Sequence, residues 1–173
     1  MILALYLACA ADDYDTGSKT DDTGTDTPTD TDTDTTTAED APLAGSWLSE
    51  GENVSTLLAG DPFNVVSVAA TFVDDGTYSV VSVDADGQSG TLTGTYVADE
   101  STDPAGIVLT QATPYSATAV GIYQIVGTTL TYEVVQTVPD YGYAPPTPET
   151  GFGTTSGNGI ESGINVQTFL RVE

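Results

Sequence analysis

The segment 64–83, NVVSVAATFVDDGTYSVVSV, decides the fold class of this chain. Its two apolar runs have a period of two, which predicts two half-buried β-strands. Between the runs, Asp74-Asp75-Gly76 supplies a turn whose glycine tolerates the positive φ of a tight hairpin. The segment therefore predicts an antiparallel hairpin. In its first strand one face is expected to hold Val66, Val68, Ala70 and Phe72.

Similar runs continue along the chain and are separated by Gly, Pro, Asn and Asp. Because each joins its neighbour through a short turn, the chain predicts a meander of sequential strands in a barrel or a sandwich. Between the last two strands, the Pro- and Gly-rich segment 138–163 predicts one long loop of unassigned role. The eight expected strands are Gly45–Ser49, Asn64–Val73, Thr77–Val83, Gly90–Ala98, Gly106–Gln111, Ala117–Val126, Thr129–Thr137 and Ile164–Val172.

Alternation also predicts which side chains of the later strands face the core. In 129–137, Leu130, Tyr132 and Val134 share one face, opposite Glu133. In 164–172, the apolar face carries Val166 and Leu170 and is expected to be buried.

Residues 10–42 have the composition of a disordered linker. Thr25–Thr35 is almost a two-letter repeat of Asp and Thr, and neither face of such a segment offers apolar surface to bury. Its like charges favour an extended spacer. A calcium-binding repeat is less consistent with the segment, because the spaced aspartates lack the glycine that folds a loop around the ion.

The start of the chain, MILALYLACA, places its single cysteine, Cys9, after an apolar run. Leu7-Ala8-Cys9 resembles a bacterial lipoprotein signal, which implies cleavage before Cys9, lipidation of its thiol and, with Ala10 following, an outer-membrane location in the cell envelope. Residues 1–9 lack a positively charged start and are short for such a signal, so we expect a truncated one. No run reaches the ~20 apolar residues of a membrane-spanning helix.

Three features of residues 43–173 resemble the lipocalin-like (calycin) barrels of bacteria. Gly45-Ser46-Trp47 opens the first strand, a DDGTY hairpin follows, and the last strand contains Arg171. The resemblance implies an all-β, antiparallel, up-and-down eight-stranded barrel whose closure brings Gly45 and Trp47 beside Arg171. A cation over an indole face would stabilise that seam by ~0.5–2 kcal/mol. A β-sandwich is the alternative, although the cysteine pair of an immunoglobulin-like domain is missing.

The composition excludes several functions. The formal charge is −24, with Lys19 and Arg171 the only basic residues, so nucleic acid is not an expected partner. Anionic membrane surfaces would repel the chain, which leaves an acyl anchor as its only membrane contact. With no histidine and one cysteine, we expect no enzymatic activity, no metal site and no cofactor.

Two carboxylate pairs, Asp74/Asp75 and Asp84/Asp86, are better explained as turn residues than as glycosidase or Ca²⁺ groups. Aromatic residues are the remaining candidates for ligand contacts. Those in strands could equally pack a core, and those in the long loop could line the barrel mouth or hold the loop onto the wall. The six candidates are Tyr78, Tyr96, Tyr123, Tyr132, Tyr141 and Tyr143.

The sequence as a whole predicts a lipid-anchored envelope protein that displays a non-enzymatic barrel on an acidic tether. The barrel is expected to bind a small apolar or neutral ligand, because no basic side chain is available inside it for an anion. The alternative is a structural or adhesive surface module whose barrel is filled by its own side chains, since eight strands leave room for either.

Overall fold

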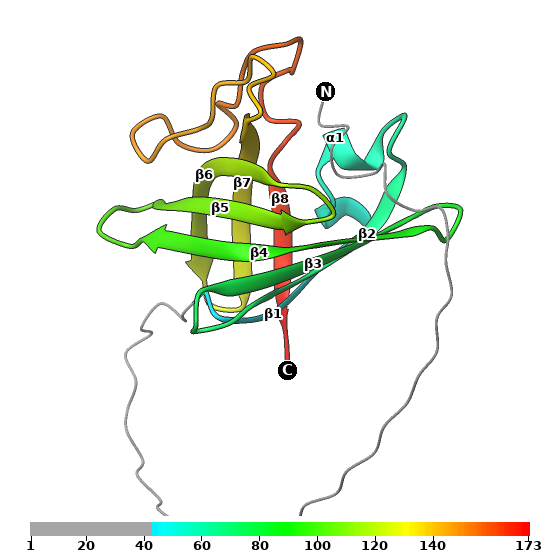
Figure 1. The fold of residues 1–173 in the computed structure, drawn as a ribbon, viewed down its shortest axis with the longest axis horizontal. Coiled ribbons are helices and arrows are strands. Elements are labelled where there is room, and N and C mark those ends of the chain that lie inside the picture. The colour runs from blue at the N-terminus through cyan, green and yellow to red at the C-terminus, as the bar shows by residue number, and fades with distance from the viewer. Residues whose placement is uncertain (1–42) are drawn as a thin grey trace, which may run out of the picture.

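The computed structural model describes residues 43–173, which form a closed antiparallel barrel of eight strands in sequential order (Figure 1). All eight expected strands are present, and the β-sandwich alternative is wrong because the first and last strands pair. The strands are β1 (Gly45–Glu50), β2 (Val65–Phe72), β3 (Thr77–Asp84), β4 (Ser89–Asp99), β5 (Ala105–Thr113), β6 (Ala117–Val126), β7 (Thr129–Val138) and β8 (Gln167–Val172).

Helical structure among these residues is confined to the β1–β2 connection, which contains the 3₁₀ turn η2 (Gly51–Asn53) and the single-turn helix α1 (Thr56–Ala59). Ser55 caps α1 by accepting a hydrogen bond from the backbone N–H of Leu58. No helix in the described part of the chain is long and apolar enough to cross a membrane.

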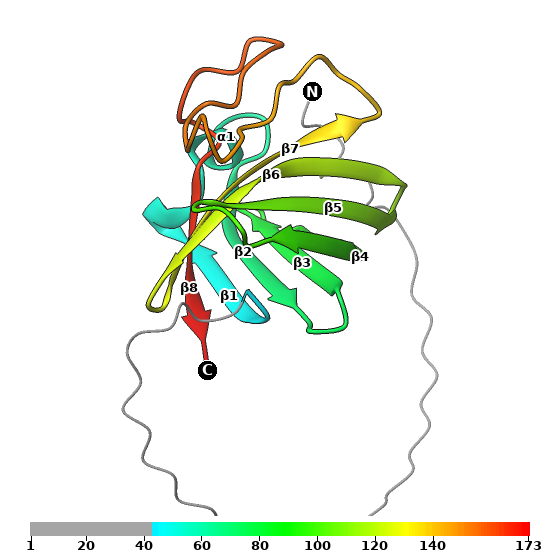
Figure 2. The ribbon, with the colours of Figure 1, turned by 90° about the vertical axis from the view of Figure 1, so that its left-hand side faces the viewer.

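The seam of the barrel is the β1–β8 pair (Figure 2). In its register Trp47 lies opposite Arg171. Figures 1 and 2 both show β8 running beside β1 to the C-terminus. Antiparallel pairing of the first and last strands leaves neither with an open hydrogen-bonding edge.

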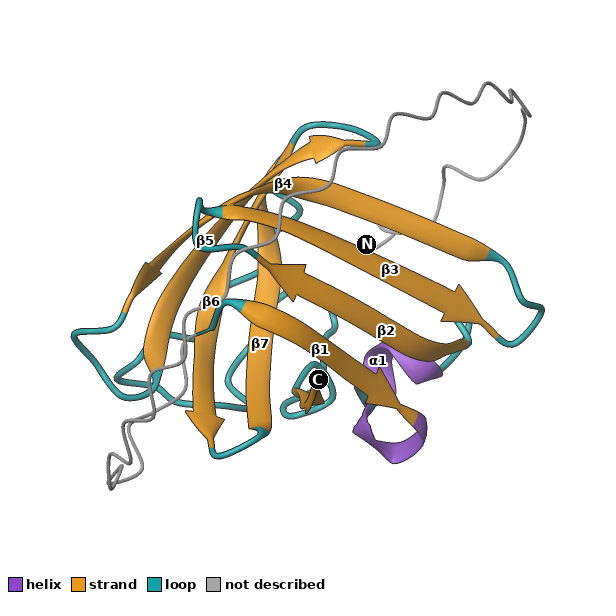
Figure 3. Ribbon diagram, turned by 90° about the horizontal axis from the view of Figure 1, so that it is seen from below, coloured by secondary structure: helices purple, strands orange, loops and turns teal. Residues whose placement is uncertain are grey.

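The two ends of the barrel differ. One end holds the C-terminus, the start of β1 and the short β2–β3 and β6–β7 turns; we call it the closed end (Figure 3). The other end holds α1, the β3–β4 and β5–β6 turns and the long β7–β8 loop; we call it the rim (Figure 1). A cluster of buried apolar residues lies inside the barrel, and its members Trp47, Ile125 and Leu130 pack toward the closed end.

The predicted inward face of β2 is confirmed in part. Val68, Ala70 and Phe72 are buried, but the placement of Val66 with them is wrong, since it is 47% exposed. A β-bulge between Val65 and Ser67 shifts the register there, so Val65 faces inward instead.

The predicted face of 164–172 is also wrong. Gln167 and Phe169 are buried, whereas Leu170 is 48% exposed. Because Trp47 faces the interior and Arg171 is its partner across the seam, the period of two directs the odd-numbered side chains of β8 inward. Residues 164–166 still belong to the loop, so the strand begins three residues later than predicted.

Candidate functional site

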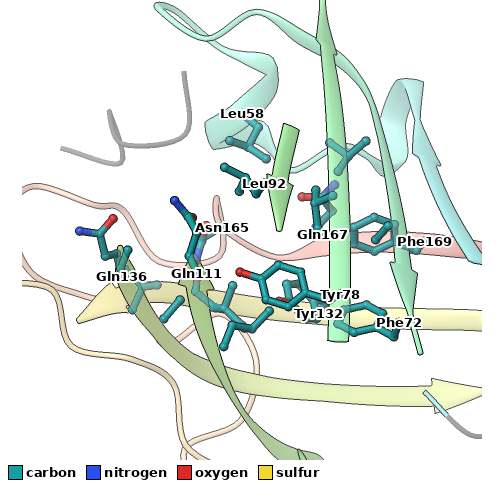
Figure 4. A pocket seen from close by; sticks show the side chains of 18 of the residues that line it. Leu58, Phe72, Tyr78, Leu92, Gln111, Tyr132, Gln136, Asn165, Gln167 and Phe169 are labelled. Carbon is teal, nitrogen blue, oxygen red and sulfur yellow. The ribbon is translucent and has the colours of Figure 1, made fainter. Parts of the chain in front are cut away.

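A cavity of about 160 Å³ lies inside the barrel, and its lining extends from the rim to Phe72 and Tyr78, near the β2–β3 turn (Figure 4). All its lining residues are uncharged, and most are apolar. They come from α1, from β2–β8, from the β5–β6 turn and from the β7–β8 loop: Leu58, Val68, Ala70, Phe72, Tyr78, Val80, Leu92, Leu109, Gln111, Tyr115, Ala117, Ala119, Tyr132, Val134, Val135, Gln136, Asn165, Gln167 and Phe169.

Aromatic rings form one wall of the cavity. The rings of Tyr132 and Phe169 meet edge to face with centroids 6.0 Å apart, and those of Phe72 and Tyr78 lie 6.2 Å apart. Burial raises the pKa of Tyr78 to about 12, and it raises the pKa of Tyr132 further. Both hydroxyls are therefore neutral at physiological pH, and the cavity presents no charge to a bound molecule.

Four carboxamides supply much of the polar lining, and three of them use their NH₂ group for the protein itself. Gln111 donates to the carbonyl oxygen of Tyr115 at 2.9 Å, and Gln136 donates to that of Pro139 at 3.3 Å. Asn165 donates to the carbonyl oxygen of Val134 at 2.8 Å. These bonds hold the loop segments of the rim against β5 and β7.

Of the tyrosines predicted as ligand contacts, the structure places only Tyr78 and Tyr132 on the cavity. Tyr96 lies at the closed end, edge to face with Phe72 at 5.1 Å, and its hydroxyl donates to the carbonyl of Val73. The Tyr123 hydroxyl donates to Glu100 across the β4–β5 connection. Contact of any of them with a ligand stays a prediction.

Tyr141 and Tyr143, from the β7–β8 loop, do not line the cavity. Tyr141 is 40% exposed, and the hydroxyl of Tyr143 accepts a hydrogen bond from Asn158 within the same loop. Cys9, the predicted lipidation site, lies outside the described residues.

The β7–β8 loop is attached to the outer wall of the barrel through Glu133. This carboxylate faces away from the cavity, since its neighbours Tyr132 and Val134 line it. It is fully buried and accepts hydrogen bonds from the backbone N–H groups of Gly153 at 2.6 Å and Thr155 at 3.1 Å. Two charge-assisted bonds to one buried carboxylate fix the loop on the outside of β7.

At the seam, the structure brings the three predicted residues together. The Arg171 guanidinium carbon lies 4.3 Å from the centroid of the Trp47 ring, and its Nη1 donates to the carbonyl of Ala44 at 3.2 Å. The indole N–H of Trp47 donates to the carbonyl of Leu43 at 2.8 Å. Gly45 is needed here, because its φ is +141° and a Cβ would stand 2.6 Å from Arg171 Nη1.

Both acidic pairs lie in turns. Asp75 accepts hydrogen bonds from the N–H and hydroxyl of Thr77, which lower the pKa of its carboxyl. Asp84 accepts two backbone N–H bonds from the β3–β4 turn. Among residues 43–173, no group of three or more Asp, Glu, His or Cys side chains could hold a metal ion.

The sequence prediction missed Gln111, Tyr115, Asn165, Gln167 and Phe169 as cavity residues. A signal for two of them was available. Once Arg171 is expected to cover Trp47 inside the seam, alternation along the same strand directs Phe169 and Gln167 inward as well. Gln111, Tyr115 and Asn165 lie at or beyond strand ends, where periodicity gives no such guide.

No protein-family model, curated protein or solved structure matches this chain significantly. Its likeness to the lipocalin-like barrels therefore consists of the eight-stranded antiparallel closed architecture.

Proposed function

We propose that this barrel binds a small apolar or uncharged molecule in its internal cavity and that it catalyses no reaction. The observation that carries the proposal is the cavity itself, a pocket of about 160 Å³ with an aromatic wall and no charged lining residue. Apolar pockets with a few placed polar groups are the usual form of small-molecule sites.

The chemistry of the lining selects against ions. An ion would lose its hydration in the cavity without meeting an opposite charge, which is costly. The cavity also favours this function over that of a barrel filled by its own side chains, since the buried side chains leave this space inside the barrel unfilled.

The size of the cavity limits the ligand. A cavity of about 150 Å³ with apolar walls is large enough to hold a benzene molecule. We therefore expect a single ring or a short alkyl chain, with any longer portion extending past the rim. Ligands of this size bind with dissociation constants in the micromolar to millimolar range.

Titration of the protein with toluene, followed by backbone NMR, tests the proposal. The signals of cavity residues such as Leu109 and Phe169 should shift saturably, while those of Ile125 and Leu130, which do not line the cavity, stay in place. Ala119→Phe, which adds a ring to the cavity wall, should abolish the shifts. Val97→Phe, at a position 72% exposed on the outer wall, is the matched control and should leave them unchanged. Absence of saturable shifts in the unmodified protein would contradict the proposal.

We further propose that the barrel is displayed on the bacterial cell envelope by an acyl anchor at Cys9 and the acidic spacer 10–42. The Leu7-Ala8-Cys9 motif and the spacer composition support this. The chain enters β1 at the closed end, so a tether attached there leaves the cavity rim unobstructed. Metabolic labelling with a palmitate analogue should mark the full-length protein but not its Cys9→Ser variant, and an unlabelled parent protein would refute the anchor.

A further inference from the structure

Gln167 differs from the other three carboxamides of the cavity. It is 6% exposed, and its Nε2 is buried without a hydrogen-bond partner among residues 43–173. The side-chain NH₂ groups of Gln111, Gln136 and Asn165 all donate to backbone carbonyls. A buried donor left unpaired is costly, and such groups in native proteins call for an explanation.

The surroundings of Gln167 are apolar and aromatic. It starts β8 opposite Tyr132, two residues before Phe169, and Figure 4 shows it near the aromatic wall and apart from Gln111, Asn165 and Gln136. Packing alone would favour a leucine or methionine at such a position, since these side chains fill the space without a polar atom. The last torsion of a glutamine side chain is broad, so a small rotation can turn its NH₂ group toward the cavity.

We propose that the cavity takes a small neutral molecule with a hydroxyl or carbonyl oxygen on an apolar ring or short chain, and that Gln167 selects this molecule by donating to the oxygen. The inference rests on the proposed binding function and adds to it the polar group of the ligand and the residue that recognises it. The apolar body of the ligand packs against the rings of Tyr78 and Phe169. The oxygen satisfies the side-chain NH₂ group of Gln167, which residues 43–173 leave unpaired.

Three probes of matched size and shape test this selection: cumene, which has no polar atom, acetophenone, which has a carbonyl, and 1-phenylethanol, which has a hydroxyl. Their dissociation constants are measured by NMR titration of the full-length protein. One neutral hydrogen bond predicts that the two oxygenated probes bind roughly 3- to 10-fold more tightly than cumene does.

Gln167→Leu should remove this preference, weakening the oxygenated probes and leaving cumene bound as tightly or more tightly. Gln124→Leu is the matched control, because Gln124 does not line the cavity and its Nε2 donates to Asp103, and this variant should keep the preference. Gln167→Met, which keeps the length of the side chain, replaces the leucine variant if the latter fails to fold, as judged by circular dichroism.

The outcomes separate the two proposals. If cumene binds as tightly as acetophenone and 1-phenylethanol, or if the preference survives the loss of Gln167, the selection by Gln167 is wrong while the binding function stands. If none of the three probes binds, the binding function itself is wrong, and the inference is lost with it.

Discussion

Replacement of Arg171 by methionine is expected to destabilise the barrel by about 2–3 kcal/mol. The guanidinium lies 4.3 Å from the centroid of the buried indole of Trp47, a geometry that contributes about 1–2 kcal/mol when partly desolvated. Its bond to the Ala44 carbonyl joins a charged donor to the chain that enters β1, and it contributes about 1 kcal/mol more. Methionine keeps an apolar stem against the ring, so the loss reports mainly on the charge.

Urea unfolding measures this loss, with the fluorescence of Trp47, the single tryptophan, and far-ultraviolet circular dichroism as independent probes. The midpoint should fall while the m-value stays the same, since the surface exposed on unfolding does not change. A double-mutant cycle with Trp47→Phe should give a coupling energy of about 1 kcal/mol between the two side chains.

Leu170→Met provides the control, because this neighbour on β8 is 48% exposed and its replacement should change stability by less than about 0.5 kcal/mol. If Arg171→Met costs no more than this control, or if the cycle gives no coupling, the seam is held by strand pairing and apolar contacts alone. The contact between Arg171 and Trp47 would then contribute nothing to closure of the barrel.

Three further perturbations test other parts of the structure. Glu133→Ala removes the acceptor of two loop amides, so it should cost about 2–4 kcal/mol of stability and speed amide hydrogen exchange in the β7–β8 loop. Glu149→Ala, at an exposed position of the same loop, should do neither. Loop amides that still exchange slowly in Glu133→Ala would count against this attachment. Gly121→Ala would bring a Cβ within 2.0 Å of the backbone carbonyl oxygen of Glu133 on β7, and this overlap should prevent folding or cost several kcal/mol. Gly127→Ala, which has open space around it but a φ of +62°, should cost only about 1 kcal/mol. Equal melting temperatures of the two variants would contradict this. Burial raises the pKa of Tyr78 from 10 to about 12, so the neutral phenol stabilises the fold fully below pH 10 and progressively less from pH 10 to 12. The fall in unfolding free energy over this pH range should therefore be less steep in Tyr78→Phe than in the parent protein. An identical pH dependence in both proteins would show that this hydroxyl is not buried in solution.

The strands and their order were accessible from the sequence because both depend on local signals. Turn residues such as Asp75 and Gly76 end one strand and begin the next, and the alternation through Leu130, Tyr132 and Val134 gives the inward face correctly. The alternation of apolar and polar residues predicted the wrong inward face at two places. The bulge at Val66 turned one side chain outward, and in β8 the more apolar face is the outer one.

Gly94 and Gly121, each two residues before a tyrosine of the same strand, show a further limit of local signals. Their positions before Tyr96 and Tyr123 can be read from the sequence, but the reason why a glycine is needed there cannot. Each lies where the backbone of the neighbouring strand approaches so closely that a Cβ would overlap a carbonyl oxygen. Such an approach exists only once the sheet has curved into a barrel.

The sequence by itself determined a meander of eight antiparallel strands, because period-two patterning and turn chemistry are local signals. Closure into a barrel was what the resemblance carried by Gly45, Trp47 and Arg171 implied, and the pairing of β1 with β8 decided it against the sandwich. Only the tertiary structure decided what covers each face. It buried Glu133 beneath a loop that lies about 20 residues further along the chain, and it left the Nε2 of Gln167 without a hydrogen-bond partner among residues 43–173. Burial of a polar side chain depends on the partners that folding brings to it, and neither residue type nor spacing along one strand encodes those partners.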